Sequence, residues 1–298
     1  VGINDHPTPR VGGAYRYLPT LSFTPNRPTP GAAALDFTPV KPQNPCPADR
    51  FLPKSIDESL QAMQTSTNRP FLSLILPVLN EAATICAQLA LLQQLRSGGV
   101  ELLLVDGGSC DGTPDLAGPW VDRLLESPRG RATQMNAGAH ASQGEVLLFL
   151  HADTTLPPAA DELIQAAMTD DVVWGRFDVR IDGHQPLLRV VESMMNWRSR
   201  LSGIATGDQG IFVRREVFER LGGYPELPLM EDIALSRQLK RIARPVCLHE
   251  RVLTSGRRWQ KHGVLRTILL MWCLRASYFL GADPQQLAIR YGYLPRRR

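Results

Sequence analysis

Residues 102–113 read Leu-Leu-Leu-Val-Asp-Gly-Gly-Ser-Cys-Asp-Gly-Thr, and residues 146–153 read Val-Leu-Leu-Phe-Leu-His-Ala-Asp. In each stretch a short apolar run stops abruptly at an acidic, Gly-rich or small-residue turn. This pattern is typical of a buried parallel strand that delivers a carboxylate to the carboxyl edge of a sheet. Open α/β sheets bind their ligands in the crevice at that edge. The two stretches therefore predict a site for a phosphorylated, metal-bound ligand.

The sequence around these stretches alternates between strand and helix patterns. We expect strands at 71–76 (ended by Pro77), 102–105, 121–125 and 146–150. We expect helices at 82–96, from Thr113, at 130–142 and from Pro157 to Met168. This alternation predicts an α/β fold with a mostly parallel, Rossmann-like sheet flanked by helices.

The second half of the chain has a more mixed pattern. Residues 172–181 suggest an antiparallel-type strand, and 210–214 and 246–248 suggest short strands. Helices are expected at 186–201, 216–221, 233–242 and 264–280. The apolar run 268–274 has Arg266 and Arg275 at its edges, on roughly opposite sides of the helix, so we favour packing against the domain or a second copy over contact with a membrane surface.

Three regions are expected. Twelve of the 24 prolines fall in residues 1–70, so we interpret 1–68 as an extended or disordered leader, with a short helix near 55–64. Residues 69–260 form the α/β domain. Residues 261–298 form a C-terminal helix and a basic tail.

The charge of the chain is uneven. The net charge is +4, but residues 257–298 hold nine Lys or Arg against one acid, Asp283. This favours an anionic partner such as a phosphate-rich ligand or a membrane surface, the alternative being a solvated tail. The five scattered cysteines form no Cys-x-x-Cys pair, which argues against a zinc knuckle or a disulfide framework and fits a reducing cytoplasm. We see no secretory signal and no apolar run long enough to span a bilayer.

Two turns carry candidate nucleotide-binding residues. Pro77, Asn80 and Glu81 follow the first strand, and we expect Asn80 to cap the next helix, whose N-terminus favours an anion. Asp106 ends the second strand, and its carboxylate can accept hydrogen bonds from a nucleoside. The alternatives are an ordinary loop at the first turn and a capping aspartate at the second.

A third turn carries a candidate metal ligand. Asp153 is a hard oxygen ligand suited to Mg²⁺ or Mn²⁺ on a diphosphate, and His151 is a second ligand or a hydrogen-bond donor. The alternative for His151 is a packed residue at a strand end.

In order and spacing, these three turns and the later Glu231-Asp232 pair resemble a family 2 glycosyltransferase of the GT-A type over roughly residues 70–260. Two positions depart from the family pattern. Gly107 replaces the second Asp of Val-Asp-Asp-Gly-Ser, and His151 replaces the first Asp of Asp-x-Asp.

The resemblance implies a GT-A fold, a nucleotide-diphosphate sugar donor of UDP type, a divalent Mn²⁺ or Mg²⁺ ion, and inversion at the sugar carbon. It implies that Asp232 and Glu231 are the catalytic residues, with Asp232 as the general base for a hydroxyl acceptor that is either a small molecule or lipid-linked. In isolation an acidic pair at a helix start is mostly a helix-dipole effect.

The resemblance also implies the remaining contacts. The residues assigned to the nucleotide are Pro77, Asn80, Glu81, Asp106, Gly108, Ser109, Arg131 and Asn136. The residues assigned to donor sugar or acceptor are Asp208, Gln209, Arg258 and Trp259, and those assigned to the metal are Asp153 and His151. A polar turn at 206–210 and ordinary surface arginines are the plain alternatives.

Five stretches, 127–132, 134–138, 205–209, 229–233 and 265–272, resemble a bacterial subgroup, the radical-SAM/selenodomain-associated glycosyltransferases, some of which are named for arsenosugar biosynthesis. From the cysteines, the basic end and the terminal helix, we expect a cytoplasmic protein that can contact the inner face of a membrane, with no nucleic-acid partner and with a homodimer as one option.

Two other functions are alternatives to glycosyl transfer. A sugar-phosphate nucleotidyltransferase would carry a Gly-rich, basic signature directly after the first strand, where this chain has Pro-Val-Leu-Asn-Glu. A degenerate module that binds a nucleotide sugar without catalysis is suggested by Gly107 and His151, whereas the retained Asp153 and Asp232 argue against it.

Overall fold

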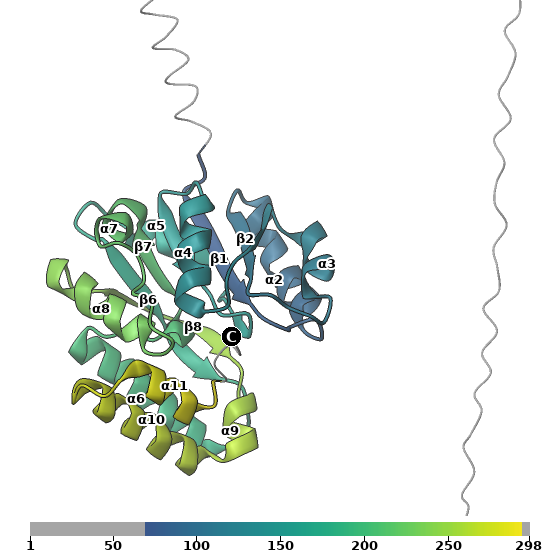
Figure 1. The fold of residues 1–298 in the computed structure, drawn as a ribbon. Helices are drawn as coiled ribbons and strands as arrows, with labels where there is room; N and C mark the ends of the chain where they lie inside the picture. The colour runs from purple at the N-terminus through teal and green to yellow at the C-terminus, as the bar shows by residue number, and fades with distance from the viewer. Residues whose placement is uncertain (1–68, 294–298) are drawn as a thin grey trace, which may run out of the picture. The chain divides into compact units, whose positions relative to one another are not determined.

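The computed structural model describes residues 69–293. The predicted leader, 1–68, and the short helix near 55–64 lie outside the described residues, as does the end of the basic tail, 294–298. Within the described part an eight-stranded sheet is surrounded by helices (Figure 1). The strands are β1 (Leu72–Val78), β2 (Glu101–Asp106), β3 (Arg123–Glu126), β4 (Val146–Phe149), β5 (Thr154–Thr155), β6 (Trp174–Ile181), β7 (Ile211–Arg214) and β8 (Val246–Thr254).

The sheet has one parallel half and one mixed half. Its strand order is β3-β2-β1-β4-β7-β6-β8-β5. Strands β3, β2, β1 and β4 run parallel, β7 is antiparallel to both β4 and β6, and β8 is parallel to β6. The predicted α/β fold with a mixed second half is confirmed. The carboxyl ends of β1, β2 and β4 meet at one edge, which is where the three polar turns of the sequence lie.

Ten helices and two 3₁₀ turns connect the strands within residues 69–293. The helices are α2 (Ile85–Ser97), α3 (Thr113–Ala117), α4 (Arg131–Ala141), α5 (Ala160–Ala167), α6 (Pro186–Ser202), α7 (Arg215–Arg220), α8 (Glu231–Ile242), α9 (Arg257–His262), α10 (Val264–Phe279) and α11 (Pro284–Tyr291). The 3₁₀ turns are η1 (Gly118–Trp120) and η2 (Gly207–Gln209).

The core lies on both faces of the sheet because side chains alternate along each strand. Leu72, Leu74 and Leu76 of β1 pack in one cluster with α2 and α5, and Ile75 packs in the other with α4, α7 and α8. Helices α6, α9, α10 and α11 gather below the sheet in Figure 1. They contribute to two smaller apolar clusters, which also include residues of β6 and α8.

Several predicted boundaries are wrong for identifiable reasons. The first strand does not end at Pro77 but continues to Val78. Ile75 accepts a hydrogen bond from Leu150 on the β4 side of the strand, and Pro77, two residues on, faces the same side beyond the end of β4. Its missing N–H therefore breaks no ladder bond, which is where a strand tolerates proline.

The helix starts also differ from the prediction. Helix α2 begins at Ile85 with Thr84 as its N-cap, so Asn80 does not cap it. The N-cap of α3 is Gly112, and Thr113 is its first residue. Helix α5 begins at Ala160, and β8 extends to Thr254. Between residues 257 and 293 there are three helices where a single one was expected, because α9 and α11 have only six and eight residues and short helices leave little periodic signal.

Candidate functional site

Two loops at the sheet edge are hydrogen-bonded to each other. The loop after β1 presents Asn80, whose backbone N–H donates to Ser109 Oγ at 2.8 Å. In return, the N–H of Cys110 donates to Asn80 Oδ1 at 2.9 Å. Asn80 has a φ of 55°, a left-handed conformation that asparagine adopts more readily than most residues. The Asn80 side chain therefore joins two loops instead of capping a helix.

Asp106 organises the loop after β2. It is 3% exposed, and its Oδ2 accepts hydrogen bonds from the N–H groups of Gly108 at 2.9 Å and Ser109 at 2.8 Å. Its Oδ1 accepts from the Ser109 hydroxyl. Because both oxygens are engaged by its own loop, Asp106 positions Ser109 and Gly108; a direct nucleoside contact through Asp106 stays a prediction.

Glu81 lies where the loops of the sheet edge approach α9. Its N–H donates to Thr113 Oγ1 at 2.9 Å, and its carboxylate lies 3.7 Å from the guanidinium of Arg257. The Glu81 side chain is partly exposed, and Asn80 is exposed. These two residues are therefore accessible to a ligand lying over the edge, whereas Pro77 is buried within β1.

Gly107 stands where the family pattern has its second aspartate. A Cβ at this position would lie 3.0 Å from the side-chain amide of Gln134. The Gln134 amide is fixed there because Nε2 donates to the carbonyls of Val78 and Val105, each at 2.8 Å. The glycine therefore fits a loop whose inner side is already filled by Gln134.

A second group of polar residues lies where β4, the η2 turn and α8 meet. Nδ1 of His151 lies 3.3 Å from Asp208 Oδ1. Burial raises the pKa of Asp208, but the contact with His151 and the charges of His151, Arg131 and Arg275 together outweigh it and leave that pKa below its usual value of 3.8. Burial likewise lowers the pKa of His151, and Asp208 more than compensates, so the imidazole pKa lies above 6.5. The two residues thus form a charge-assisted pair.

Asp232 is fixed at the start of α8 by two backbone groups. Its Oδ2 accepts from the N–H of Gly207 at 2.8 Å, and its Oδ1 accepts from its neighbour Ile233 at 2.7 Å. The side chain remains partly exposed. Met230, the N-cap of α8, has a φ of 71°, a conformation that costs free energy in a non-glycine residue and is often retained at functional sites.

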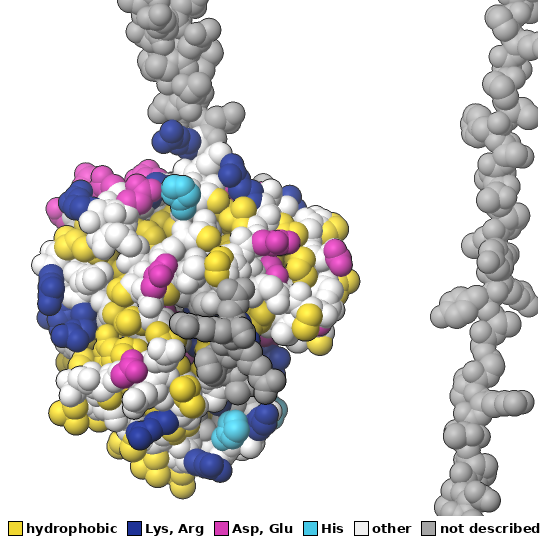
Figure 2. Space-filling model, in the orientation of Figure 1, with side chains coloured by type: hydrophobic (Ala, Val, Ile, Leu, Met, Phe, Trp, Pro, Cys, Tyr) yellow, Lys and Arg dark blue, Asp and Glu magenta, His cyan; other side chains and the backbone are white. Residues whose placement is uncertain are grey.

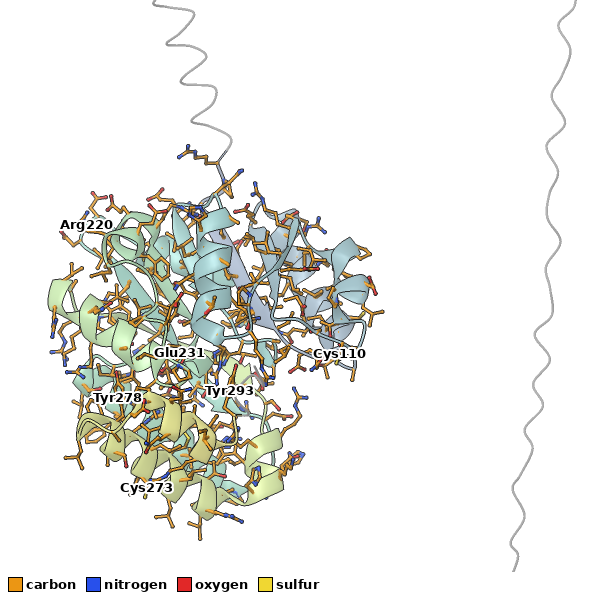
Figure 3. All side chains as sticks on the ribbon, viewed as in Figure 1. Cys110, Arg220, Glu231, Cys273, Tyr278 and Tyr293 are labelled. Carbon is orange, nitrogen blue, oxygen red and sulfur yellow. The ribbon has the colours of Figure 1, made fainter. Side chains whose placement is uncertain are left out.

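Glu231 is buried beside Asp232. It is 3% exposed, and its carboxylate lies 3.7 Å from Nε of Arg131. Burial raises the pKa of Glu231 above 4.5, and Arg131 opposes this shift. Burial would lower the pKa of Arg131, but the charges of Glu231, Asp232 and Asp208, together with Tyr291, raise it above its usual range. Figure 3 shows Glu231 between the sheet and the C-terminal helices.

Two of the residues expected to contact a ligand, Asn136 and Gln209, form hydrogen bonds with the protein backbone. Asn136 exchanges two hydrogen bonds with the backbone of Tyr224, at 2.9 and 2.8 Å, and so braces the loop before α8. Gln209 is fully buried, and its Oε1 accepts from the N–H of Thr206 at 3.1 Å. Both residues therefore hold neighbouring loops in place.

A cavity of about 420 Å³ opens beside Asp153 and Asp208. Its other walls come from α6, α9, α10 and α11 and include Arg258 and Trp259. Arg258 lies 3.7 Å from the centre of the Tyr291 ring and donates to the Tyr291 carbonyl at 3.3 Å, so this arginine is held by α11. Asp153 is exposed at the cavity wall.

Sequence reasoning missed Arg198 and Tyr291 and gave Arg275 no role. These residues come from α6, α11 and α10 and line the cavity together. No local motif marks them, since each is a single residue in a separate helix. Only the packing of the helices brings them to Asp208.

The residues present fit a divalent ion only in part. Among residues 69–293, no group of three or more His, Cys, Asp or Glu side chains could hold a metal by itself. Asp153 and Asp208 nevertheless line the same cavity, and Mg²⁺ is commonly held by one or two carboxylates together with substrate phosphates. His151 is less suited to the metal, because its Nδ1 faces Asp208 and its Nε2 packs against Gly207.

The sequence profile described as "Glycosyl transferase family 2" matches residues 73–222, which is half of the chain. The chain belongs to glycosyl transferase family 2. The predicted family is thereby confirmed, while the radical-SAM/selenodomain-associated subgroup stays a prediction.

Curated relatives match this family 2 chain over only part of their length. PGL/p-HBAD biosynthesis glycosyltransferases of Mycobacterium tuberculosis and Mycobacterium bovis are 39% identical over 105 residues, 33% of this chain and 41% of theirs. Glycosyltransferase AglE of Haloferax volcanii is 29% identical over 174 residues, 52% of this chain and 56% of its own. The matches thus span about half, or less, of the length of these relatives.

A solved structure shares the fold. Mannosyltransferase PcManGT of Pyrobaculum calidifontis, solved in complex with GDP-Man and Mn²⁺, is 24% identical, has a TM-score of 0.52, and is matched over 77% of this chain and 67% of its own. The predicted GT-A fold is confirmed. Within the described residues, no helix is both long and apolar enough to cross a membrane.

Proposed function

We propose that this family 2 chain transfers a sugar from a nucleotide-diphosphate donor to a hydroxyl acceptor, with inversion at the sugar carbon. Family membership and the names of the relatives support glycosyl transfer. One observation carries the mechanism: Asp232 is partly exposed and is held by two backbone N–H groups beside the turn that presents Asp208. A carboxylate fixed in this way suits a general base.

The proposed reaction is one displacement. Asp232 takes the proton of the acceptor hydroxyl while the hydroxyl oxygen bonds to the anomeric carbon. The bond from that carbon to the diphosphate oxygen breaks, and the nucleoside diphosphate leaves with the electron pair. Because attack and departure occur on opposite faces of the ring, the configuration inverts. Glu231 is a positioning residue in this scheme, since it is buried and faces Arg131.

The donor would lie over the edge of β1, β2 and β4. Asn80, Glu81 and Ser109 are accessible residues of the joined loops, and Arg131 supplies a permanent positive charge for the diphosphate. Asp153 would hold Mn²⁺ or Mg²⁺, which neutralises the charge of the leaving group when bound. His151 would keep Asp208 in place.

A binding experiment tests this proposal. UDP and GDP are titrated into the full chain by calorimetry, with and without Mn²⁺. We expect one nucleotide to bind, with Mn²⁺ tightening binding about tenfold or more, which equals about 1.4 kcal/mol. Asp153→Asn should remove the effect of Mn²⁺, while Asp115→Asn, on the exposed start of α3, should not.

The products separate the alternatives. With the matching nucleotide sugar, release of nucleoside diphosphate supports the transferase, whereas formation of pyrophosphate from a sugar phosphate and a nucleoside triphosphate would identify a nucleotidyltransferase. Tight binding of a nucleotide sugar without any turnover would identify the non-catalytic module. Absence of nucleotide binding with either metal present would refute the proposal.

A further inference from the structure

The cavity beside Asp208 has two chemically different parts. One wall is apolar and comes from Met194 and Trp197 of α6 and Met271 and Trp272 of α10. Met194, Trp197 and Trp272 are 49%, 66% and 56% exposed, so this part opens at the surface. In Figure 2 the lower edge of the molecule, over α6 and α10, is lined by hydrophobic side chains.

The other part of the cavity is basic. Arg198 of α6 and Arg275 of α10 line it, and neither forms an ion pair with any residue between 69 and 293. Nε and Nη2 of Arg198 and Nε of Arg275 are buried without a hydrogen-bond partner in the same part of the chain. A buried donor without an acceptor costs about 1–3 kcal/mol, so these groups are suited to an anion that supplies acceptors.

The two guanidinium groups also repel each other. Burial and the nearby charge of Arg275 lower the pKa of Arg198 to about 10. Two cations placed together without an intervening anion are unfavourable, and an anion between them would remove both the repulsion and the unsatisfied donors. The charge of Asp232 acts on the pKa of Arg198, and the charge of Arg275 acts on the pKa of Asp208. The two arginines therefore lie next to the proposed reaction site.

We infer that this cavity is the acceptor subsite and that it takes an amphiphile: an anionic head group held by Arg198 and Arg275, and an apolar body lying along Met194, Trp197 and Trp272. As an acceptor assignment this rests on the proposed function, with the acceptor hydroxyl reaching Asp232. The binding of the amphiphile does not depend on turnover. The unpartnered donors account for the head group and the exposed apolar wall accounts for the tail.

The test uses octyl phosphate as a probe, below its micelle concentration, with tryptophan fluorescence as the signal, since three tryptophans line the cavity. Octyl glucoside and inorganic phosphate are the two partial ligands. We expect octyl phosphate to bind at least tenfold more tightly than either. Arg198→Gln and Arg275→Gln should reduce its affinity to that of octyl glucoside. Arg266 is an exposed arginine on α10, the helix of Arg275, and Arg266→Gln should leave the affinity for octyl phosphate unchanged.

Nucleotide titrations of the same variants separate this inference from the proposed function. Unchanged nucleotide affinity in Arg275→Gln supports an acceptor subsite, and displacement of octyl phosphate by nucleoside diphosphate would overturn it. Equal affinities for octyl phosphate and octyl glucoside would also overturn it, even if the nucleotide binds. If Arg198→Gln does not fold, Arg275→Gln and the three probes on the unaltered protein still decide.

A lipid and a soluble amphiphile share this chemistry. Sedimentation with vesicles that carry a long-chain alkyl phosphate distinguishes them. Retention of the protein on these vesicles, compared with vesicles that carry the matching alcohol, supports a membrane lipid. Protein that binds octyl phosphate but remains in the supernatant supports a soluble acceptor of the same class.

Discussion

The backbone N–H of Gly207 donates a hydrogen bond of 2.8 Å to Oδ2 of Asp232. This contact joins the η2 turn, which presents Asp208, to the first turn of α8. The hydrogen bond orients the Asp232 carboxylate, which we propose as the base, relative to the η2 turn. The position of Asp232 therefore depends on a residue 25 positions earlier in the chain.

Asp232→Asn should abolish transfer while leaving the protein folded. The amide can still accept the hydrogen bond from Gly207 but cannot take a proton, and removal of a general base costs about 10²–10⁴-fold in rate. The measurement is release of nucleoside diphosphate under saturating donor. Asp115→Asn, which changes an exposed acid in the first turn of α3, is the control and should keep full activity. Unchanged turnover in Asp232→Asn would exclude this residue as the base.

Gly207→Ala should destabilise the site. An added Cβ would overlap the ring of His151, and overpacking of this kind costs about 1–3 kcal/mol. We expect a lower melting temperature and a lower transfer rate. Gly118→Ala is the matched control because a Cβ there has no heavy atom within 4 Å and its φ is −45°. Equal stability of the two variants would show that the His151 ring moves aside freely.

Asp106→Asn should loosen the nucleotide-side loops. The carboxylate is 3% exposed and accepts the N–H groups of Gly108 and Ser109, so losing one acceptor leaves a buried donor at a cost of about 1–3 kcal/mol. Denaturant unfolding measures this loss, and calorimetry should show weaker nucleotide binding. Asp170→Asn, at an exposed loop position, should change neither. Full nucleotide affinity in Asp106→Asn would separate the loop from the nucleotide site.

The stability of the protein should depend on Glu231 in a defined direction. Burial raises the pKa of this carboxyl above 4.5, so the folded state binds its proton more tightly than the unfolded state does. The contribution of Glu231 to the free energy of unfolding is therefore largest at low pH. It declines as the pH rises from about 4.5 through the folded pKa, and stays low above that pKa.

Comparison with Glu231→Gln measures this effect, because glutamine does not titrate. The free energy of unfolding of the variant, minus that of the unaltered protein, should increase over this pH window and then level off. Denaturant midpoints at pH 4.5 to 8 give the curve. A difference that does not change with pH would contradict the raised pKa.

The turns that carry Asp106 and Asp153 could be predicted because the sequence pattern that marks them is local. An apolar run that stops at an acid reports both the buried strand and the edge at which it ends. Helix starts were less predictable. Asn80 resembles a cap in the sequence, but its side chain bonds to Cys110, 30 residues away, and Thr84 takes the cap position.

Local patterns were enough to predict the α/β class, the edge of the sheet that carries the polar turns, and the presence of Asp232 at a helix start, since each of these depends on short-range periodicity and residue type. What those residues contact depends on how distant parts of the chain pack together. The tertiary structure directs Asp106 into its own loop, pairs His151 with Asp208, and brings Arg198 and Arg275 to one cavity. The reason is that helix packing and loop contacts join residues far apart in the chain, and no local pattern encodes their meeting.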